Sequence, residues 1–102
     1  MRALVFEGPG LIAVRDRPEP KILDDGDAIV RIGASGLCGS DLHPYLGREP
    51  IARGTIPGHE AVGVVEAVGP AVEAVSVGQR VVVPFTTSCG RCDPCRRGLS
   101  AR

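Results

Sequence analysis

The residues from Leu37 to His43 place a thiol, a hydroxyl, a carboxylate and an imidazole within a few consecutive positions. Gly39 within the stretch, Gly36 just before it and only two apolar side chains accompany them, so the stretch does not have the regular apolar period of a packed strand or helix. A second short group, Gly58-His59-Glu60, lies further along the chain. Cys38 and His59 are donors that zinc prefers, and catalytic zinc sites use three protein ligands and one open position. The two segments therefore predict part of a metal site.

Each of these residues also has an ordinary structural explanation when it is taken alone. Cys38 could be a small buried hydrophobic side chain, and His59 a hydrogen-bonded histidine in a strand. Glu60 could be a solvated carboxylate, and Ser40 and Asp41 could simply cap a helix. Residue type alone does not separate these readings from a metal site.

A second cluster, Cys89-Gly90-Arg91-Cys92-Asp93-Pro94-Cys95, has C-x2-C-x2-C spacing in a segment rich in Gly and Pro. A tight turn in such a segment lets neighbouring sulfurs bind one cation at about 2.3 Å. Tetrahedral zinc takes four ligands, and this cluster supplies three. A disulfide, free thiols and an iron–sulfur cluster are the alternatives that this spacing leaves open.

The composition limits the kind of protein that carries these clusters. The 102 residues balance 12 cationic against 12 acidic side chains, with three aromatic residues, so we expect neither nucleic acid nor a membrane as a partner. No apolar run approaches the roughly 18 residues of a membrane span, and we expect an unexported, cytoplasmic protein. In that compartment four cysteines indicate metal or redox chemistry rather than disulfides.

The elements that must position the clusters are expected to be short strands. Fourteen glycines and nine prolines, with many small aliphatic side chains, favour an all-β domain with many turns. The apolar runs predict strands over residues 3–6, 11–14, 28–34, 58–69 and 79–84, the first two forming a hairpin. Five to seven such strands suggest a small barrel or sandwich.

The connections between these strands carry turn signals. The segment 24–27 is expected to be a turn in which aspartate side chains bond their own backbone. A short helical turn is expected over residues 40–46, with Ser40 as its N-cap and Gly47 as its stop. Residues 48–57 are expected to form a surface loop that lets the chain double back. After Phe85 the core pattern ends.

Three motifs in this order and spacing resemble one known family. Cys38-Gly39-Ser40-Asp41-Leu42-His43, Gly58-His59-Glu60 and the C-x2-C-x2-C cluster together are similar to the N-terminal part of the zinc-dependent medium-chain alcohol dehydrogenases. The resemblance extends over nearly all 102 residues. It implies a GroES-like small β-barrel with short helical turns and a protruding cysteine-rich loop. It also implies that residues 1–102 form one domain, incomplete at its C-terminal end, whose zinc lobe begins near residue 86.

The resemblance implies a role for each motif residue. Cys38 and His59 match ligands of a catalytic zinc, with Glu60 as a carboxylate that can approach the metal. Ser40 matches a hydroxyl that passes the alcohol proton outward, and His43 matches a position that continues this relay. In the family the zinc acts as a Lewis acid on the alcohol during hydride transfer to the nicotinamide. Asp41 matches a residue that supports the zinc ligands without binding the metal itself. The other matched zinc ligands are those of a structural site: Cys89, Cys92 and Cys95.

The resemblance also implies that parts are missing. The fourth thiolate of the structural site would follow Arg102, and the third catalytic ligand and the dinucleotide-binding fold for NAD or NADP would lie further on. We therefore expect a truncated dehydrogenase whose 102 residues alone are inactive and hold zinc incompletely at both sites. The parent would act on a small-molecule alcohol or aldehyde, and it could form a homo-oligomer.

Two other functions compete with the dehydrogenase. A non-enzymatic zinc ribbon would use the cysteine cluster to contact a partner and leave Cys38 and His59 idle. A chaperonin-like ring subunit would share the barrel, but its function needs none of the motif residues.

Overall fold

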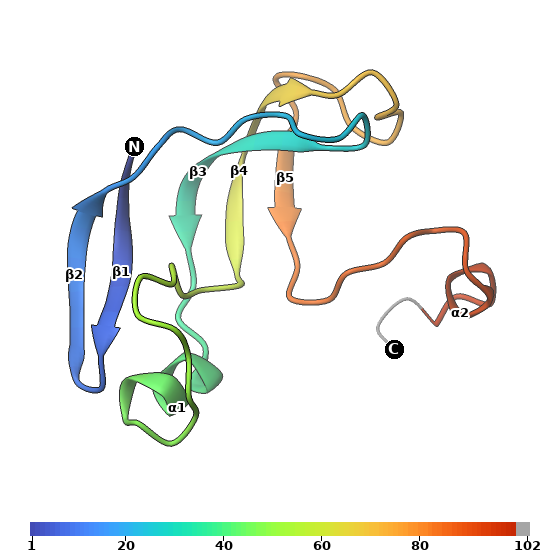
Figure 1. The fold of residues 1–102 in the computed structure, drawn as a ribbon. Helices are drawn as coiled ribbons and strands as arrows, with labels where there is room; N and C mark the ends of the chain where they lie inside the picture. The colour runs from blue at the N-terminus through green and yellow to red at the C-terminus, as the bar shows by residue number, and fades with distance from the viewer. Residues whose placement is uncertain (100–102) are drawn as a thin grey trace.

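The computed structural model describes residues 1–99, which form five strands and three short helices (Figure 1). In chain order the elements are β1 (Arg2–Gly8), β2 (Leu11–Asp16), β3 (Ala28–Ser35), the 3-10 helix η1 (Gly39–Asp41), α1 (Leu42–Tyr45), β4 (Ala61–Val68), β5 (Arg80–Val83) and α2 (Asp93–Arg96). The prediction of a mostly-β domain is confirmed.

The N-terminal hairpin is confirmed and is longer than the apolar runs indicated. β1 and β2 pair antiparallel, in a register that runs from Arg2 opposite Asp16 to Phe6 opposite Ile12. Gly10 closes the turn at φ 72°, a left-handed conformation that glycine adopts without steric cost. Val5 and Phe6 are both buried, so β1 contributes adjacent residues to the core.

The second sheet has the order β3-β4-β5, with both pairings antiparallel. Its crowded point is Gly63 in β4, where an added Cβ would overlap the carbonyl of Arg31 and the side chain of Val30. The β3–β4 ladder changes register beside this position, between Ile32 and Ala34. Glycine therefore lets the two backbones approach closely here.

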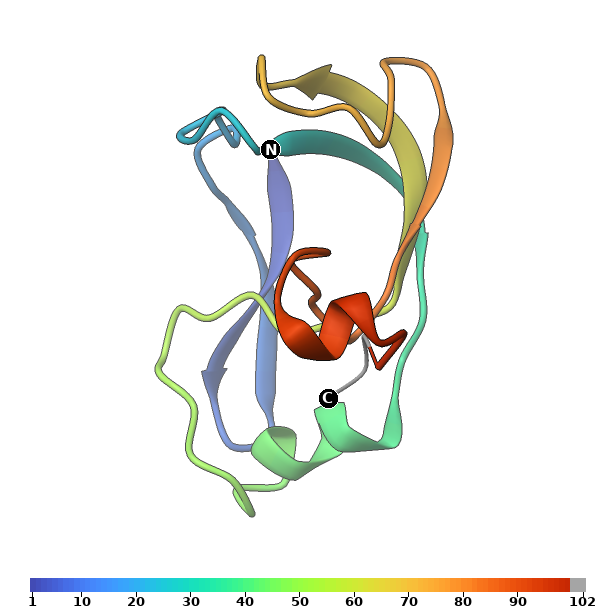
Figure 2. The same cartoon turned by 90° about the vertical axis from the view of Figure 1, so that its right-hand side faces the viewer.

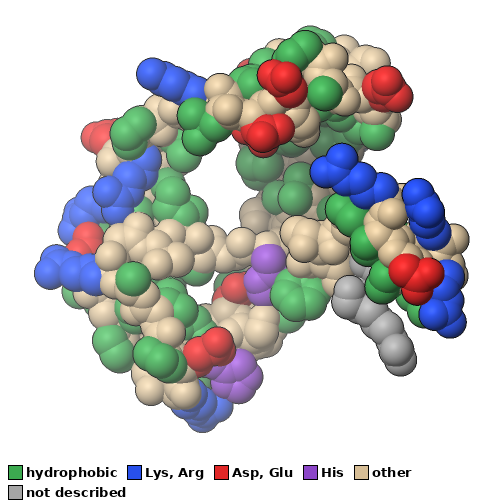
Figure 3. All heavy atoms as spheres, turned by 45° about the vertical axis from the view of Figure 1, so that its right-hand side comes forward, with side chains coloured by type: hydrophobic (Ala, Val, Ile, Leu, Met, Phe, Trp, Pro, Cys, Tyr) green, Lys and Arg blue, Asp and Glu red, His purple; other side chains and the backbone are tan. Residues whose placement is uncertain are grey.

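The strands of residues 1–99 do not close into a barrel. β1 and β2 form one sheet and the other three strands form a second, and no ladder joins the two. Figure 2 shows the two sheets facing each other, and the space-filling view in Figure 3 shows a gap in the molecule between them. The hydrophobic side chains buried within the described residues are Val5, Phe6 and Val65. The expected strands are present, but closure needs ladder bonds all round the ring.

The turn over residues 24–27 is held by aspartate side chains, as predicted. Asp27 Oδ2 accepts hydrogen bonds from the backbone N–H groups of Leu23 at 2.9 Å and Asp24 at 3.0 Å, and Asp24 Oδ1 accepts one from Gly26 at 3.0 Å. These two backbone donors, Leu23 before Asp24, lower the pKa of the Asp27 carboxyl. The turn thus fixes the start of β3, the strand that leads to Cys38.

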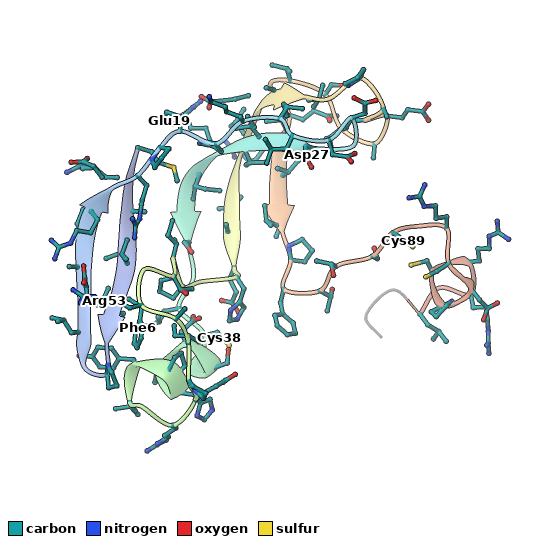
Figure 4. The ribbon with its side chains drawn as sticks, viewed as in Figure 1. Phe6, Glu19, Asp27, Cys38, Arg53 and Cys89 are labelled. Atoms are coloured by element: carbon teal, nitrogen blue, oxygen red, sulfur yellow. The ribbon has the colours of Figure 1, made fainter. Side chains whose placement is uncertain are left out.

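The loop over residues 48–57 contains no helix or strand, as predicted, and it is fastened to the hairpin. Phe6 exchanges backbone hydrogen bonds with Thr55 at 2.9 Å and Gly54 at 2.8 Å. The Glu7 carboxylate pairs with Arg53 of the loop at 2.7 Å and with Arg15 of β2 at 2.8 Å. The Arg53 guanidinium, followed by that of Arg15, lowers the pKa of Glu7. Figure 4 shows Arg53 beside the hairpin, so β1 fixes the chain just before His59.

The helical turn after β3 begins earlier than predicted. Cys38, not Ser40, is the N-cap of η1, because the Asp41 carboxylate reaches back and accepts the Cys38 N–H at 2.9 Å. The predicted end is confirmed: Gly47 has φ 70° and its N–H donates to the Pro44 carbonyl at 3.0 Å. The helix α2 was not predicted. No helix within residues 1–99 is long and apolar enough to cross a membrane.

Candidate metal centres

The sheet brings Cys38, His59 and Glu60 together, and we call these three residues the distributed site. Cys38 follows β3 and His59 and Glu60 precede β4, whose pairing starts with Ser35 opposite Ala61. One sulfur, one ring nitrogen and one carboxylate oxygen lie within 4.8 Å of one another. Residues that are 21 positions apart in the sequence thus face one point because β3 and β4 are neighbours.

The strand predicted over residues 58–69 is shorter at its start, and this frees the site residues. β4 begins at Ala61, so His59 and Glu60 lie outside the ladder. The Glu60 carbonyl still accepts hydrogen bonds from the Gly36 N–H at 2.7 Å and from the Ser35 hydroxyl at 2.9 Å. The two bonds hold this backbone against the end of β3 while its side chains are free to point to one another.

Asp41 supports both potential ligands of the distributed site. Its Oδ2 accepts the backbone N–H of Cys38 at 2.9 Å, and its Oδ1 lies 3.3 Å from Nδ1 of His59. The Asp41 side chain is 11% exposed, so these contacts are sheltered from water. Because Asp41 occupies Nδ1, Nε2 is the ring nitrogen that His59 can offer to a metal.

Ser40 also contacts the site, and its neighbours shift the pKa values of the thiol and the imidazole. The Ser40 hydroxyl lies 3.4 Å from Nε2 of His59. The pKa of Cys38 is lowered, first by the Ser40 hydroxyl, then by the Ser40 backbone N–H and by His59. The pKa of His59 is raised, chiefly by its hydrogen bond with Cys38. The lowered pKa of Cys38 favours the thiolate, the form of cysteine that binds metals.

His43, the second residue proposed for proton transfer, lies apart from this network. It is part of α1, and the side-chain hydrogen bonds found within residues 1–99 do not include one from its ring. The structure therefore brings Ser40 to the distributed site but does not join His43 to it.

Phe85 is a contact of the site that sequence reasoning missed. Its ring meets the His59 ring edge to face, with centroids 5.2 Å apart and planes at 64°. The side chain is 72% exposed, so it flanks the imidazole from the solvent side. In the sequence Phe85 is only the last apolar residue before the cysteine cluster, and no spacing rule connects it with His59.

The second candidate centre is the segment around Cys89, Cys92 and Cys95, which we call the cysteine lobe. Its three sulfurs also lie within 4.8 Å of one another, with 3.4 Å between those of Cys92 and Cys95. All four cysteines of the chain are free, so the disulfide alternative is not what the structure shows. Figures 1 and 4 show the lobe projecting away from both sheets, with Cys89 far from Cys38.

The lobe is organised by its own backbone. Cys92 is the N-cap of α2, and Cys95 lies within that one-turn helix. The Cys92 N–H donates to the Cys89 sulfur at 3.3 Å. The N–H groups of Arg91 and then Cys92 lower the pKa of Cys89 to about 7. The Cys95 N–H lowers the pKa of Cys92, but the two neighbouring thiols outweigh it and the net pKa is raised.

Both clusters fit zinc by donor chemistry. Zinc binds thiolate at about 2.3 Å and imidazole or carboxylate at about 2.0–2.2 Å. Donor atoms within 4.8 Å of one another can reach one such ion with small side-chain movements. The distributed site offers sulfur, nitrogen and oxygen with an open side, as catalytic zinc sites do, whereas the lobe offers sulfur alone, as structural sites do.

Comparison with known proteins gives a consistent family. Residues 24–102 match the family model described as "Alcohol dehydrogenase GroES-like domain". The chain is 49% identical over 102 residues to "Zinc-type alcohol dehydrogenase B" of Aspergillus flavus, covering 100% of this chain and 24% of that protein. The match shows which class of protein carries these motifs.

Solved structures share the fold. The alcohol dehydrogenase TADH from Thermus sp. ATN1 superposes with a TM-score of 0.91 at 45% identity, over 98% of this chain and 29% of that one. The short chain alcohol dehydrogenase rspB from E. coli CFT073, solved with the cofactor NADH, gives a TM-score of 0.74 at 38% identity, over 98% and 29%. The chain spans about a quarter to a third of the length of the curated relatives it matches.

Proposed function

Because this chain belongs to the alcohol dehydrogenase GroES-like domain family, we propose that it forms the metal-binding part of the catalytic domain of a zinc-dependent, NAD(P)-linked alcohol dehydrogenase. The observation that carries the proposal is the convergence of Cys38, His59 and Glu60 from two distant segments. A zinc ribbon uses clustered cysteines but has no need for this second set of donors.

In this proposal Cys38, His59 and Glu60 hold the catalytic zinc. A bound zinc ion would supply Lewis-acid chemistry that favours ionisation of an alcohol hydroxyl. Cys38 would bind as a thiolate and His59 through Nε2, because its Nδ1 faces Asp41. The open side of the cluster would admit the alcohol or aldehyde substrate.

Ser40 and His43 would move the substrate proton. The Ser40 hydroxyl already lies at hydrogen-bonding range of His59, beside the Cys38 sulfur, so it can accept a proton from a bound alcohol and donate its own. His43 would take over that proton on the solvent side after a change in side-chain position, since it is exposed on α1.

The cysteine lobe would bind a second, structural zinc through Cys89, Cys92 and Cys95, with a fourth ligand from outside residues 1–99. We propose that residues 1–102 make one GroES-like domain, with the lobe starting near residue 86. Residues 1–99 contain no βαβ unit of the kind that binds dinucleotides. NAD(H) or NADP(H) would therefore bind in another part of the parent enzyme, and the 102 residues alone would not oxidise alcohols.

The test is a Co²⁺ titration of the metal-free chain, followed by the visible absorption of the bound ion. Wild type should bind cobalt in two classes of site. Cys38→Ser and His59→Ala should each abolish one class, and Cys89→Ser the other, because each site loses one of three donors. If Cys38→Ser leaves cobalt binding unchanged, the chain is better described as a zinc ribbon.

The predicted lack of activity is checked in the same preparation. Zinc-dependent reduction of NAD⁺ or NADP⁺ with a short alcohol, lost in Cys38→Ser, would show that residues 1–102 suffice for catalysis.

A further inference from the structure

The backbone of Glu60 is fixed from two sides at the end of β3. Its carbonyl accepts the Gly36 N–H at 2.7 Å and the Ser35 hydroxyl at 2.9 Å. Glu60 therefore starts from a defined position directly opposite Gly36. Only its side-chain rotamer decides whether the carboxylate reaches the sulfur of Cys38 and the ring of His59.

The Glu60 carboxylate fills the volume that a side chain at position 36 would occupy. A Cβ built on Gly36 would overlap Oε2 of Glu60 and would lie 3.2 Å from its Cβ. Figure 4 shows Cys38 in the segment that follows, below the end of β3. The missing side chain at Gly36 is thus what lets the carboxylate lie over this backbone, next to the other donors.

Other glycines of the chain differ from Gly36 in what an added side chain would meet. An added Cβ at Gly63 would meet the fixed carbonyl of Arg31, so that glycine serves strand packing. An added Cβ at Gly39 would meet nothing within 4 Å, although Gly39 is next to Cys38. At Gly36 the overlapping atom is the tip of a flexible side chain, and the Glu60 Cβ at 3.2 Å needs only a small shift. An alanine there would therefore turn the carboxylate away without breaking the sheet.

We propose that Gly36 is a positioning residue for the Glu60 carboxylate, because its lack of a side chain leaves the space in which that carboxylate lies beside Cys38 and His59. The inference rests on the proposed metal site. It adds the residue that determines where the oxygen donor of that site lies. A side chain at position 36 would force the carboxylate into another rotamer, away from the other two donors, so the site gains affinity from the glycine.

The experiment measures Co²⁺ affinity and the visible spectrum in a chain whose lobe cysteines are replaced, Cys89→Ser with Cys92→Ser and Cys95→Ser, so that only the distributed site reports. Gly36→Ala should weaken cobalt binding about tenfold and shift the visible bands, since losing a positioning contact at a metal site costs 10–100-fold. The matched control Gly39→Ala should change neither, and circular dichroism should show that both variants keep the sheet.

A double-mutant cycle separates positioning from general damage. Glu60→Gln should weaken binding by about the same factor as Gly36→Ala. Gly36→Ala added to Glu60→Gln should then cause no further loss. Unchanged affinity in Gly36→Ala, or additive losses in the double variant, would overturn the role of Gly36 and leave the metal site standing. No cobalt binding in the parent of the series would overturn the metal site itself.

Discussion

The distributed site and the cysteine lobe each bring three donor atoms within 4.8 Å of one another, but by different means. The lobe does so within seven residues, through backbone N–H groups and one helical turn. The distributed site needs the β3–β4 ladder, the Asp41 carboxylate and the loop that Glu7 and Arg53 fasten. One cluster is a property of a short peptide, and the other is a property of the fold.

The two centres should therefore depend differently on the stability of the folded domain. The hydrophobic side chains buried within residues 1–99 are few, and many large ones are exposed. The free energy of unfolding should therefore be small. The distributed site exists only while the two sheets are in place. The lobe can hold metal as long as its own turn forms, because short cysteine-rich segments fold around the ion they bind.

The largest expected effect comes from Gly63→Ala. The new methyl group would press on the Arg31 carbonyl and the Val30 side chain, and such overpacking costs about 1–3 kcal/mol. We expect loss of metal from the distributed site with retention at the lobe, measured by equilibrium dialysis and circular dichroism. Gly39→Ala serves as the control. Equal loss from both centres would show that they depend on the fold alike.

Asp41→Asn should have the next largest effect. In asparagine one of the two accepting oxygens becomes an NH2 donor, which cannot accept either the Cys38 N–H or the Nδ1–H of His59, so the ligands lose part of their support. We expect metal affinity at the distributed site to fall about tenfold, with no change at the lobe. Asp93→Asn in the exposed lobe, where the carboxylate only lies 3.5 Å from Arg97, is the matched control. A comparable loss in both variants would contradict this role.

The smallest expected effect is on thiol reactivity in the metal-free lobe. With its pKa lowered to about 7, Cys89 gains thiolate as the pH rises through 7 and loses it below, whereas an ordinary thiol with a pKa near 9 is about 1% ionised there. The gain in thiolate is about fiftyfold, but a weaker base is also about eightfold less nucleophilic. Alkylation of Cys89 at pH 7 should thus be about sixfold faster than that of an ordinary thiol.

Iodoacetamide pulses analysed by mass spectrometry would measure this rate at each cysteine. Cys92, whose pKa is raised, should react more slowly than Cys89 at pH 7 and provides the comparison within the same segment. A midpoint for Cys89 near pH 9 would mean that the N–H groups of Arg91 and Cys92 do not hold its thiolate.

Local signals in the sequence predicted most strands, the aspartate turn and the end of the helical segment at Gly47. They succeeded because each depends on neighbours within a few residues, such as Asp27 accepting two nearby N–H groups. The predicted N-cap of η1 was wrong because both Cys38 and Ser40 could begin the helix. Asp41 selects Cys38, because its carboxylate accepts the Cys38 N–H.

The contacts that complete the site could not be read from spacing. Phe85 meets His59, and Glu60 lies over Gly36, only because strands distant in the sequence are neighbours in the sheet. The motif resemblance identified the potential ligands, but it did not show how their backbone is held. For the same reason the separate β1–β2 and β3–β4–β5 sheets could not be told from a closed barrel by counting strands.

The strand β5 has a consequence for handling the protein in solution. Within residues 1–99 it pairs only with β4, and Val82 at its centre is 74% exposed. A strand with one free edge and an apolar surface is a template on which another extended chain can add. With a formal net charge of zero, little electrostatic repulsion keeps the molecules apart. Concentrated samples should be prone to form strand-mediated aggregates, and a lysine at position 82 would act as a gatekeeper against them.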